Sequence, residues 1–273
     1  MLRIGYHVSI SGSLDLAFDR ARKIGCTCMQ IFPSNPRSWA MKALEKGEVE
    51  RFRAKGKSFG ISPVFAHMPY LPNLASPKED VYCKSVEALG DVAKRCETLG
   101  IEYLIAHLGS NLGTDEEEAF ERVVESVRVA GRAAPRTRIL LENEAGQRNS
   151  VGSKLEDLVA LYNRIGIRNL GFCVDTCHLF AAGYDIGKSE VAEEVAGTLG
   201  SSRIHAIHLN DAKHPLGSGL DRHENIGFGY IGRQGFETFF RCEGMKTKPI
   251  ILETPGLRAG VGELKLVEKI LKN

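Results

Sequence analysis

The chain has 273 residues, of which 43% are hydrophobic and 26% charged, the proportions of a globular protein that can bury a sizeable core. No apolar run is long enough to span a bilayer, and the first residues show no secretory signal, so we expect a cytoplasmic protein without membrane association. The 36 basic and 34 acidic residues leave a net charge of only +2, which excludes the global basic excess of many nucleic-acid-binding proteins. Any site for a polyanion must therefore be local.

Eight short apolar runs have the length and composition of buried strands, and segments with helical spacing of apolar residues lie between them. The segment 13–25 is the clearest helix, because Gly25 stands where a C-terminal cap belongs. Ser76, Thr114 and Ser153 are each followed three residues later by glutamate, a capping-box pattern that predicts the start of a helix. In chain order, the expected strands are 3–9, 27–33, 63–68, 102–108, 138–143, 170–176, 203–209 and 249–254.

The alternation of strands and helices predicts the fold. A parallel strand needs a crossover helix before the next strand, and eight such units in a chain of this length are typical of a closed barrel. No linker, low-complexity tract or charge block divides the sequence. We therefore expect one α/β domain over residues 1–273, a single (β/α)8 TIM barrel whose active site lies at the C-terminal ends of the strands.

Histidines and acids stand at the ends of six of these runs. Imidazole nitrogens and carboxylate oxygens, without thiolates, are the usual ligands of catalytic divalent metals such as zinc. One histidine at a strand end is more often structural, but six such positions on one face favour a metal centre. The nine candidate ligands are His67, His107, Glu142, Asp175, His208 and Glu253 at run ends, with His178, Asp221 and His223 in two tighter clusters.

The remaining histidines and the cysteines are weaker candidates. His205 lies three residues before His208 and should face away from it, His214 lies in a loop, and His7 ends the first strand as a position of intermediate interest. The seven cysteines are odd in number and scattered, and they form no CxxC pair, which excludes a disulfide framework or a zinc finger. We expect most of them to be small buried residues.

Eight motifs follow one another over nearly the whole chain: NPRSW, HMPYLPN, AHLGS, LENEAG, CVDTCHLFAAGYD, HLNDAK, DRHENIGFGYIG and ILETP. In these motifs and their order the sequence resembles endonuclease IV, the zinc-dependent apurinic/apyrimidinic endonuclease family of DNA base-excision repair. The resemblance implies the TIM-barrel fold that the strand pattern also predicts.

The resemblance further implies a trinuclear site with three Zn2+ ions per chain. The first zinc would be held by His67, His107 and Glu142, the second by Glu142, Asp175, His208 and Glu253, and the third by His178, Asp221 and His223. Glu142 would bridge two metals, which makes it the candidate catalytic residue. Zinc lowers the pKa of bound water towards about 7, so a hydroxide could attack phosphorus at neutral pH.

The implied substrate is double-stranded DNA that contains an abasic site. The cut would fall on the 5′ side of that site and leave a 3′-hydroxyl and a 5′-deoxyribose phosphate, and removal of 3′-blocking groups should accompany it. Arg37, Tyr70 and Leu71 match the family's intercalating positions. The candidates for phosphate contacts, in loops that follow barrel strands, are Lys154, Lys213 and Arg222. We expect a monomer.

Two other classes of function stay open at this point. A xylose-isomerase-like sugar isomerase or epimerase would share the barrel and a carboxylate/histidine metal site. Such an enzyme has no evident use for His178, Asp221 and His223, or for the loops around Arg37 and Tyr70. A non-catalytic DNA-binding protein with structural zinc would be expected to carry closed, cysteine-rich sites, and the sequence has none.

Overall fold

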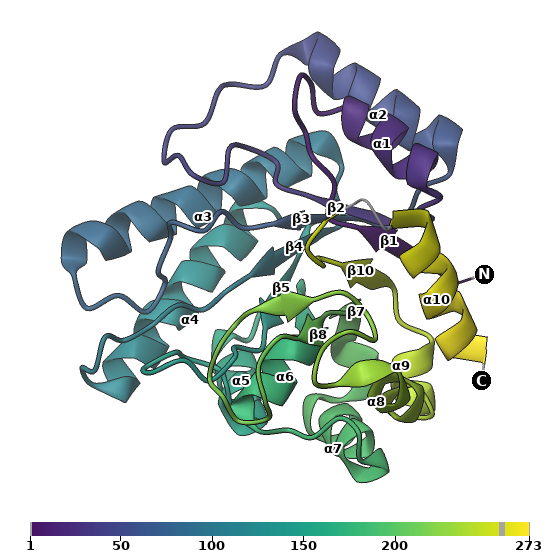
Figure 1. Ribbon diagram of the computed structural model, residues 1–273. Helices are drawn as coiled ribbons and strands as arrows, with labels where there is room; N and C mark the ends of the chain where they lie inside the picture. Colours follow the sequence, from purple (N-terminus) through teal and green to yellow (C-terminus); the bar gives the residue numbers. More distant parts are fainter. Residues whose placement is uncertain (1, 257–259, 273) are drawn as a thin grey trace.

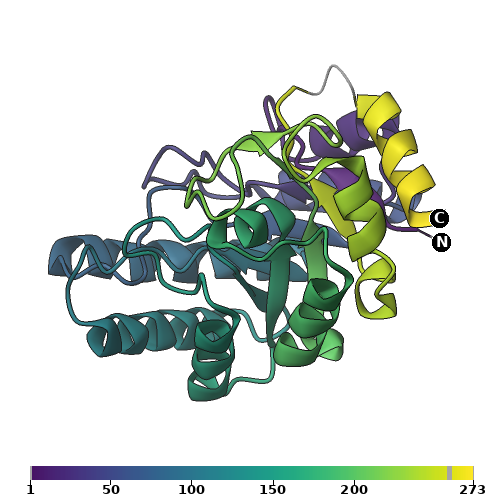
Figure 2. The same ribbon diagram turned by 60° about the horizontal axis from the view of Figure 1, so that its bottom comes forward.

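The computed structural model describes residues 2–256 and 260–272. Its strands lie in the middle of the molecule and its helices surround them (Figures 1 and 2). The strands of the eight-stranded parallel sheet are β1 (Ile4–Tyr6), β2 (Met29–Ile31), β3 (Val64–His67), β4 (Tyr103–Ala106), β5 (Arg138–Glu142), β6 (Leu170–Asp175), β7 (Ile204–His208) and β10 (Ile250–Leu252). Each lies within one of the eight runs that the sequence predicts as strands.

The sheet closes on itself. Its hydrogen-bonded order is β1-β10-β7-β6-β5-β4-β3-β2, and a parallel bridge between His7 and Gln30 joins the two ends. The amide of Val8 also donates to the carbonyl of Gln30 at 2.8 Å. Glycine permits this approach, because a Cβ atom on Gly5 would lie only 1.8 Å from the carbonyl oxygen of Cys28. The predicted (β/α)8 barrel is therefore confirmed.

The helices follow the strands around the barrel, and a two-stranded antiparallel hairpin of β8 (Asp211–Ala212) and β9 (His223–Glu224) follows β7. None of the described helices is long and apolar enough to cross a membrane. The helices are α1 (Leu16–Ile24), α2 (Lys46–Phe59), α3 (Glu79–Leu99), α4 (Glu116–Ala133), α5 (Leu155–Ile165), α6 (Thr176–Ala182), α7 (Ser189–Leu199), α8 (Gly232–Phe239), α9 (Glu243–Lys246) and α10 (Gly260–Lys272), with a 3-10 turn η1 (Ser201–Arg203).

The predicted helix ends are partly right. Gly25 caps α1 with φ at 86°, as expected. The predicted capping box at Thr114 is wrong. Helix α4 is capped by Asp115, whose side chain accepts a hydrogen bond from the amide of Glu118 at 2.8 Å. The hydroxyl of Thr114 instead donates to the carbonyl of Asn111. A carboxylate is a strong acceptor beside the positive end of a helix dipole, which favours Asp115 over its neighbour.

The other two capping boxes are also absent. Ser76 accepts a hydrogen bond from the amide of Lys78 at 3.2 Å, before α3 begins, so it makes a local turn instead of capping the helix. Helix α5 begins at Leu155 and has no side-chain cap from Ser153. These serines therefore lie near helix starts without satisfying the first helical amides.

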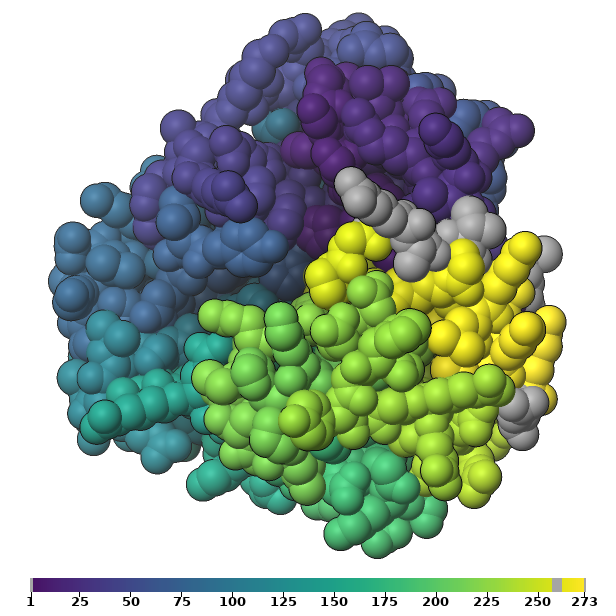
Figure 3. Space-filling model, viewed as in Figure 1, coloured from purple at the N-terminus to yellow at the C-terminus, as the bar shows by residue number. Residues whose placement is uncertain are grey.

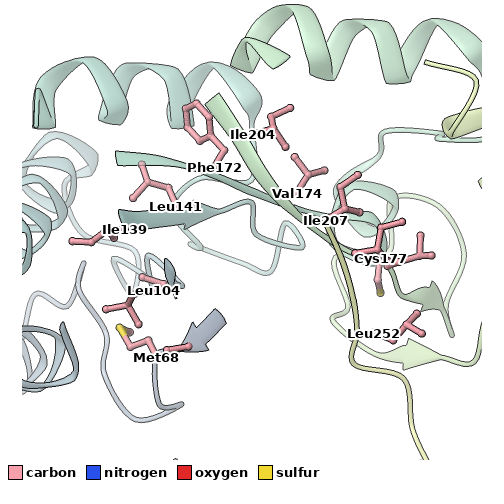
Figure 4. Close-up of a cluster of buried hydrophobic side chains, with 14 of the residues drawn as sticks. Met68, Leu104, Ile139, Leu141, Phe172, Val174, Cys177, Ile204, Ile207 and Leu252 are labelled. Carbon is pink, nitrogen blue, oxygen red and sulfur yellow. The ribbon is translucent and has the colours of Figure 1, made fainter. Parts of the chain in front are cut away.

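Alternation along each strand separates two buried layers. In β5, Ile139 and Leu141 belong to the large cluster between the strands and the helices, part of which Figure 4 shows, whereas Leu140 belongs to a smaller cluster inside the barrel. The smaller cluster consists of Cys28, Phe65, Ile105, Leu140, Cys173, Ala206 and Ile251. Since side chains alternate along a strand, the residue two positions after each of these also points into the barrel, one layer nearer its C-terminal mouth.

Candidate metal centre at the barrel mouth

A ring of polar residues lies one layer above the inner apolar cluster. Counting two positions from the inner residue of each strand gives one polar side chain per strand, and β1 contributes the residue two positions after Gly5. The ring consists of His7, Gln30, His67, His107, Glu142, Asp175, His208 and Glu253. Six of these eight are metal ligands predicted from the sequence.

Glu142, the ring residue of β5, is fully buried. Its Oε2 atom is 3.2 Å from Nε2 of His67 and 3.5 Å from Nε2 of His107. The three side chains offer ligand atoms that all lie within 4.8 Å of one another. The structure therefore brings together the first predicted ligand set.

The second predicted set meets around His208, whose ring is fully buried. Its Nδ1 atom lies 2.7 Å from Oε1 of Glu142 and 3.3 Å from Oε2 of Glu253. The same nitrogen lies 3.9 Å from Oδ2 of Asp175. Three carboxylates from β5, β6 and the end of β10 thus surround one imidazole nitrogen.

The third predicted set combines α6 with the hairpin after β7. Asp175 ends β6 and accepts from the amide of His178 at 2.8 Å, which starts α6 directly above the ring. The hairpin brings Asp221 and His223 to the same place. Oδ1 of Asp221 lies 3.3 Å from Nε2 of both His178 and His223.

These imidazoles have the arrangement that a metal requires, with one ring nitrogen held by the protein and the other left for the centre. The Nδ1 atom of His178 lies 2.9 Å from the carbonyl oxygen of Asn143, and that of His223 lies 3.3 Å from the carbonyl oxygen of Glu253. Within the described residues, Nε2 of His178 and of His223 is buried and makes no hydrogen bond, although Oδ1 of Asp221 lies 3.3 Å from each. A buried polar atom of this kind is costly unless a ligand binds it, so the residues fit divalent metals.

The charges in the site perturb the pKa values strongly. Burial alone would raise the pKa of Glu142, but His107 and His208 outweigh it and hold that pKa well below its ordinary range. Burial opposes protonation of His107, yet Glu142 and Glu144 raise its pKa to about 10. In the same way, Asp221 and Asp175 raise the pKa of His223 to about 9. Without metals the site therefore retains protons, which a bound cation would displace.

A cavity of about 560 Å³ opens from the ring to the surface. In the space-filling view it lies between loops of the N-terminal part of the chain and loops of its last third (Figure 3). Its lining includes His67, His107 and Asp221 below, and Tyr70 and Arg222 at the rim.

The predicted intercalating residues, Arg37, Tyr70 and Leu71, lie in two neighbouring loops after β2 and β3. The amide of Tyr70 donates to the carbonyl of Pro36 at 3.3 Å, which joins the two loops. Tyr70 is 65% exposed, although its ring also meets the edge of Phe32 with 5.0 Å between the centroids. Leu71 is 39% exposed, and Arg37 is exposed in the neighbouring loop.

The three predicted phosphate contacts lie at the surface as well. Lys213 and Arg222 lie opposite each other, because the amide of Lys213 donates to the carbonyl of Arg222 at 2.9 Å. Lys154 immediately precedes α5. These positions place positive charge on loops after β5 and β7.

The weaker histidine candidates and the cysteines lie outside the three proposed ligand sets. His205 contacts Arg138 and stacks on Tyr103, with 5.6 Å between the ring centroids. His7 lies beside the site, with Nδ1 3.3 Å from Oε1 of Glu253. All seven cysteines are free, and all except Cys83 are buried.

Four residues that contact the candidate ligands were not singled out from the sequence. Gln30 donates to Glu253 at 2.6 Å, and its carbonyl oxygen lies 2.8 Å from Nε2 of His208. The others are Asn143, whose side chain pairs with the backbone of Asp175, Glu144, which lies beside His107, and Asn210, which donates to Asp175. Their motifs LENEAG and HLND are visible in the sequence, but the pairings depend on which strands are neighbours.

Comparison with known proteins agrees with this geometry. Residues 18–270 match the family model described as a xylose isomerase-like TIM barrel. "Probable endonuclease 4" of Methanoculleus marisnigri is 46% identical over 93% of this chain and 93% of its own length, and that of Thermotoga maritima is 42% identical over 94% and 92%. The crystal structure of endonuclease IV from Thermus thermophilus superposes with a TM-score of 0.89 at 35% identity, covering 99% of both chains.

The likeness to sugar epimerases shows the fold alone. A D-tagatose 3-epimerase-like protein superposes with a TM-score of 0.76, but at 20% identity over 98% of this chain and 97% of that one. Fold and site together define a TIM-barrel enzyme with a carboxylate and imidazole centre at the strand ends, suited to divalent metals. Within that class, the chain belongs to the endonuclease 4 family, as its motifs predict.

Proposed function

We propose that this protein hydrolyses the phosphodiester bond on the 5′ side of an abasic site in double-stranded DNA. The products are a 3′-hydroxyl and a 5′-deoxyribose phosphate, and the same centre removes 3′-blocking groups. The observation that carries the proposal is the convergence of nine imidazole and carboxylate side chains below an open cavity, in a member of the endonuclease 4 family.

Three zinc ions are proposed, one for each ligand set described above, with Glu142 shared between the first and the second. When bound, such cations provide a hydroxide at neutral pH and offset negative charge on the reacting phosphate and on the departing oxygen. Three divalent cations carry six positive charges against the four carboxylates of Glu142, Asp175, Asp221 and Glu253. The remaining excess of two positive charges suits a phosphodiester and a hydroxide.

The loops above the centre would open the duplex. A duplex holds an abasic nucleotide within its stack, so an enzyme that acts on the abasic sugar must take it out of the helix and fill the gap. Tyr70 and Leu71 are exposed apolar side chains beside the cavity, and Arg37 lies in the loop that Tyr70 joins. Lys154, Lys213 and Arg222 would then bind backbone phosphates without sequence preference.

Among the described residues, no lysine is placed for the alternative lyase chemistry. A β-elimination lyase needs a lysine that forms a Schiff base with the open-chain aldehyde of the abasic sugar. No lysine ends a barrel strand, and among the described residues none lines the cavity. The proposed reaction is therefore hydrolytic.

A duplex with a single tetrahydrofuran abasic analogue tests this function, since the analogue has no aldehyde. Full activity is expected, with a cut on the 5′ side and a 3′-hydroxyl end, and borohydride should trap no adduct on a natural abasic site. A trapped adduct, or activity restricted to the natural aldehyde, would overturn the hydrolytic assignment.

Elemental analysis of the purified protein tests the metal centre separately. Three metals per chain, mostly zinc, are expected from the three ligand sets, and a single metal per chain would contradict the trinuclear site. A monomeric state and a cytoplasmic location stay predictions from the sequence. Sedimentation of the free protein checks the former.

A further inference from the structure

The five imidazoles proposed as metal ligands differ in what holds their outer ring nitrogen. Four of them face neutral acceptors: His67 the carbonyl of Met68 at 2.7 Å, His178 that of Asn143 at 2.9 Å, His223 that of Glu253 at 3.3 Å, and His208 the amide oxygen of Gln30 at 2.8 Å. His107 alone faces a carboxylate, with Nδ1 3.0 Å from Oε1 of Glu144. The difference singles out Glu144, which the proposed mechanism does not use.

Glu144 is built to hold His107 in place. The same Oε1 atom accepts a second hydrogen bond from the amide of Leu108 at 3.1 Å, so one oxygen fixes both the ring and the following backbone. The amide of Glu144 is itself anchored on the carbonyl of Gly152 at 3.1 Å.

His107 needs such support more than the other imidazoles do. Its side chain is 29% exposed, against 18% for His223 and 3% or less for His67, His178 and His208. An exposed ring is held less firmly by packing, so its orientation depends more on hydrogen bonds.

We propose that Glu144 is a positioning residue that acts through His107 to retain the first metal, an inference that rests on the proposed metal centre. Its carboxylate would keep a proton on Nδ1, so that Nε2, which lies 3.5 Å from Oε2 of Glu142, would be the nitrogen that binds the first metal. Its negative charge also makes the imidazole a stronger electron donor. A carboxylate at this position lowers the positive excess of the centre from two charges to one.

The test replaces the charge and keeps the shape. Glu144→Gln retains an oxygen for His107 and Leu108 but loses the charge, whereas Glu144→Ala loses both. Competition of the metal-free protein with a zinc-chelating dye should show one of three zinc ions bound about 10- to 100-fold more weakly in Glu144→Gln, and more weakly still in Glu144→Ala. The control is Glu125→Gln, which loses only a surface ion pair with Arg132 and should bind zinc like the native protein.

A double variant shows whether Glu144 acts through His107. His107→Ala should lose the same zinc, and adding Glu144→Gln to it should leave the affinity for the other two unchanged. Native-like affinity for all three ions in Glu144→Gln, within about twofold, would overturn the inference. Weakening of the other two ions in the double variant would also overturn it, because Glu144 would then support the loop and not the ligand. If His107→Ala itself binds as much zinc as the native protein, the proposed centre fails instead.

Discussion

Replacing Glu142 with glutamine perturbs the proposed centre at the one side chain shared by two ligand sets. The side chain is fully buried, with Oε2 facing His67 and His107 and Oε1 facing His208. Glutamine has nearly the same shape but converts one of these oxygens to an amide nitrogen, which has no lone pair to offer a metal. Whichever way the amide turns, one metal loses its share of Glu142.

The expected effect on the rate follows from the loss of one cation. A catalytic metal contributes several kcal/mol to stabilising the transition state, and a loss of about 4 kcal/mol corresponds to about 10³-fold in rate. Binding of DNA should be retained, because Arg37, Tyr70 and Leu71 lie in loops after β2 and β3. Among the described residues, none of these three makes a hydrogen bond or an ion pair with Glu142. Losing one Zn2+ together with the Glu142 carboxylate would lower the positive excess of the proposed centre only from two charges to one.

The assay measures three quantities on one preparation: zinc per chain, the single-turnover rate on a tetrahydrofuran duplex, and affinity for that duplex by fluorescence anisotropy. Loss of about one zinc and of the rate, with affinity kept, is the expected result. Loss of affinity in parallel with the rate would refute the reasoning, because it would mean that the site collapses without the bridging carboxylate.

Three further predictions concern the wedge, the protons of the metal-free site and the core. Tyr70→Ala should weaken affinity for an abasic duplex on the order of tenfold and affinity for undamaged duplex much less, since stacking is worth about 1–3 kcal/mol only where the helix opens; equal losses in anisotropy would make Tyr70 an ordinary backbone contact. In metal-free protein the raised pKa values of His107, to about 10, and His223, to about 9, mean that folding takes up protons, so the stability they contribute is complete below pH 6.5 and is lost as the pH rises through 9 to 10. Urea unfolding should therefore give a free energy that falls over this range, and a rise would contradict the assignment. Phe172→Ala in the buried core should cost about 3–5 kcal/mol in the same assay, against about 0.5 kcal/mol or less for the exposed Phe228→Ala, and similar losses in both would contradict the packing described.

The barrel could be predicted because its strands are buried on both sides and read as apolar runs, each ended by a polar residue. The helix starts were harder, since a serine or threonine followed by glutamate also occurs next to a better cap. Asp115 shows this, because it stands between Thr114 and the first turn of α4 and takes the amide of Glu118 itself. A capping pattern identifies the neighbourhood of a helix start, and competition between adjacent acceptors decides the residue.

The sequence indicates candidate ligands through their distinctive side-chain chemistry, and it does not indicate the residues that contact other side chains. Glu144 resembles any exposed acid in the sequence, and its role depends on β4 lying next to β5, which places it beside His107. Asn143 likewise acts across the β5–β6 pair, where its amide bonds the backbone of Asp175. Such contacts depend on which strands are neighbours in the sheet, and the sequence pattern does not give that information directly.

The register of the barrel also includes two positions outside the nine predicted ligands, one of which, His7, is the position of intermediate interest at the end of the first predicted strand. Every ligand at a strand end lies two residues after an inward-facing residue, and the same count from Gly5 and Cys28 leads to His7 and Gln30. An amide is not a usual zinc ligand, so the residue type of Gln30 does not indicate a metal site. Yet the side-chain oxygen of Gln30 lies 2.8 Å from Nε2 of His208, and its nitrogen donates to Oε1 of Glu253. The remaining atoms, Nδ1 of His208 and Oε2 of Glu253, lie 3.3 Å apart and face the centre. A ring position outside the proposed ligand sets can therefore decide which atoms of its neighbours face the centre.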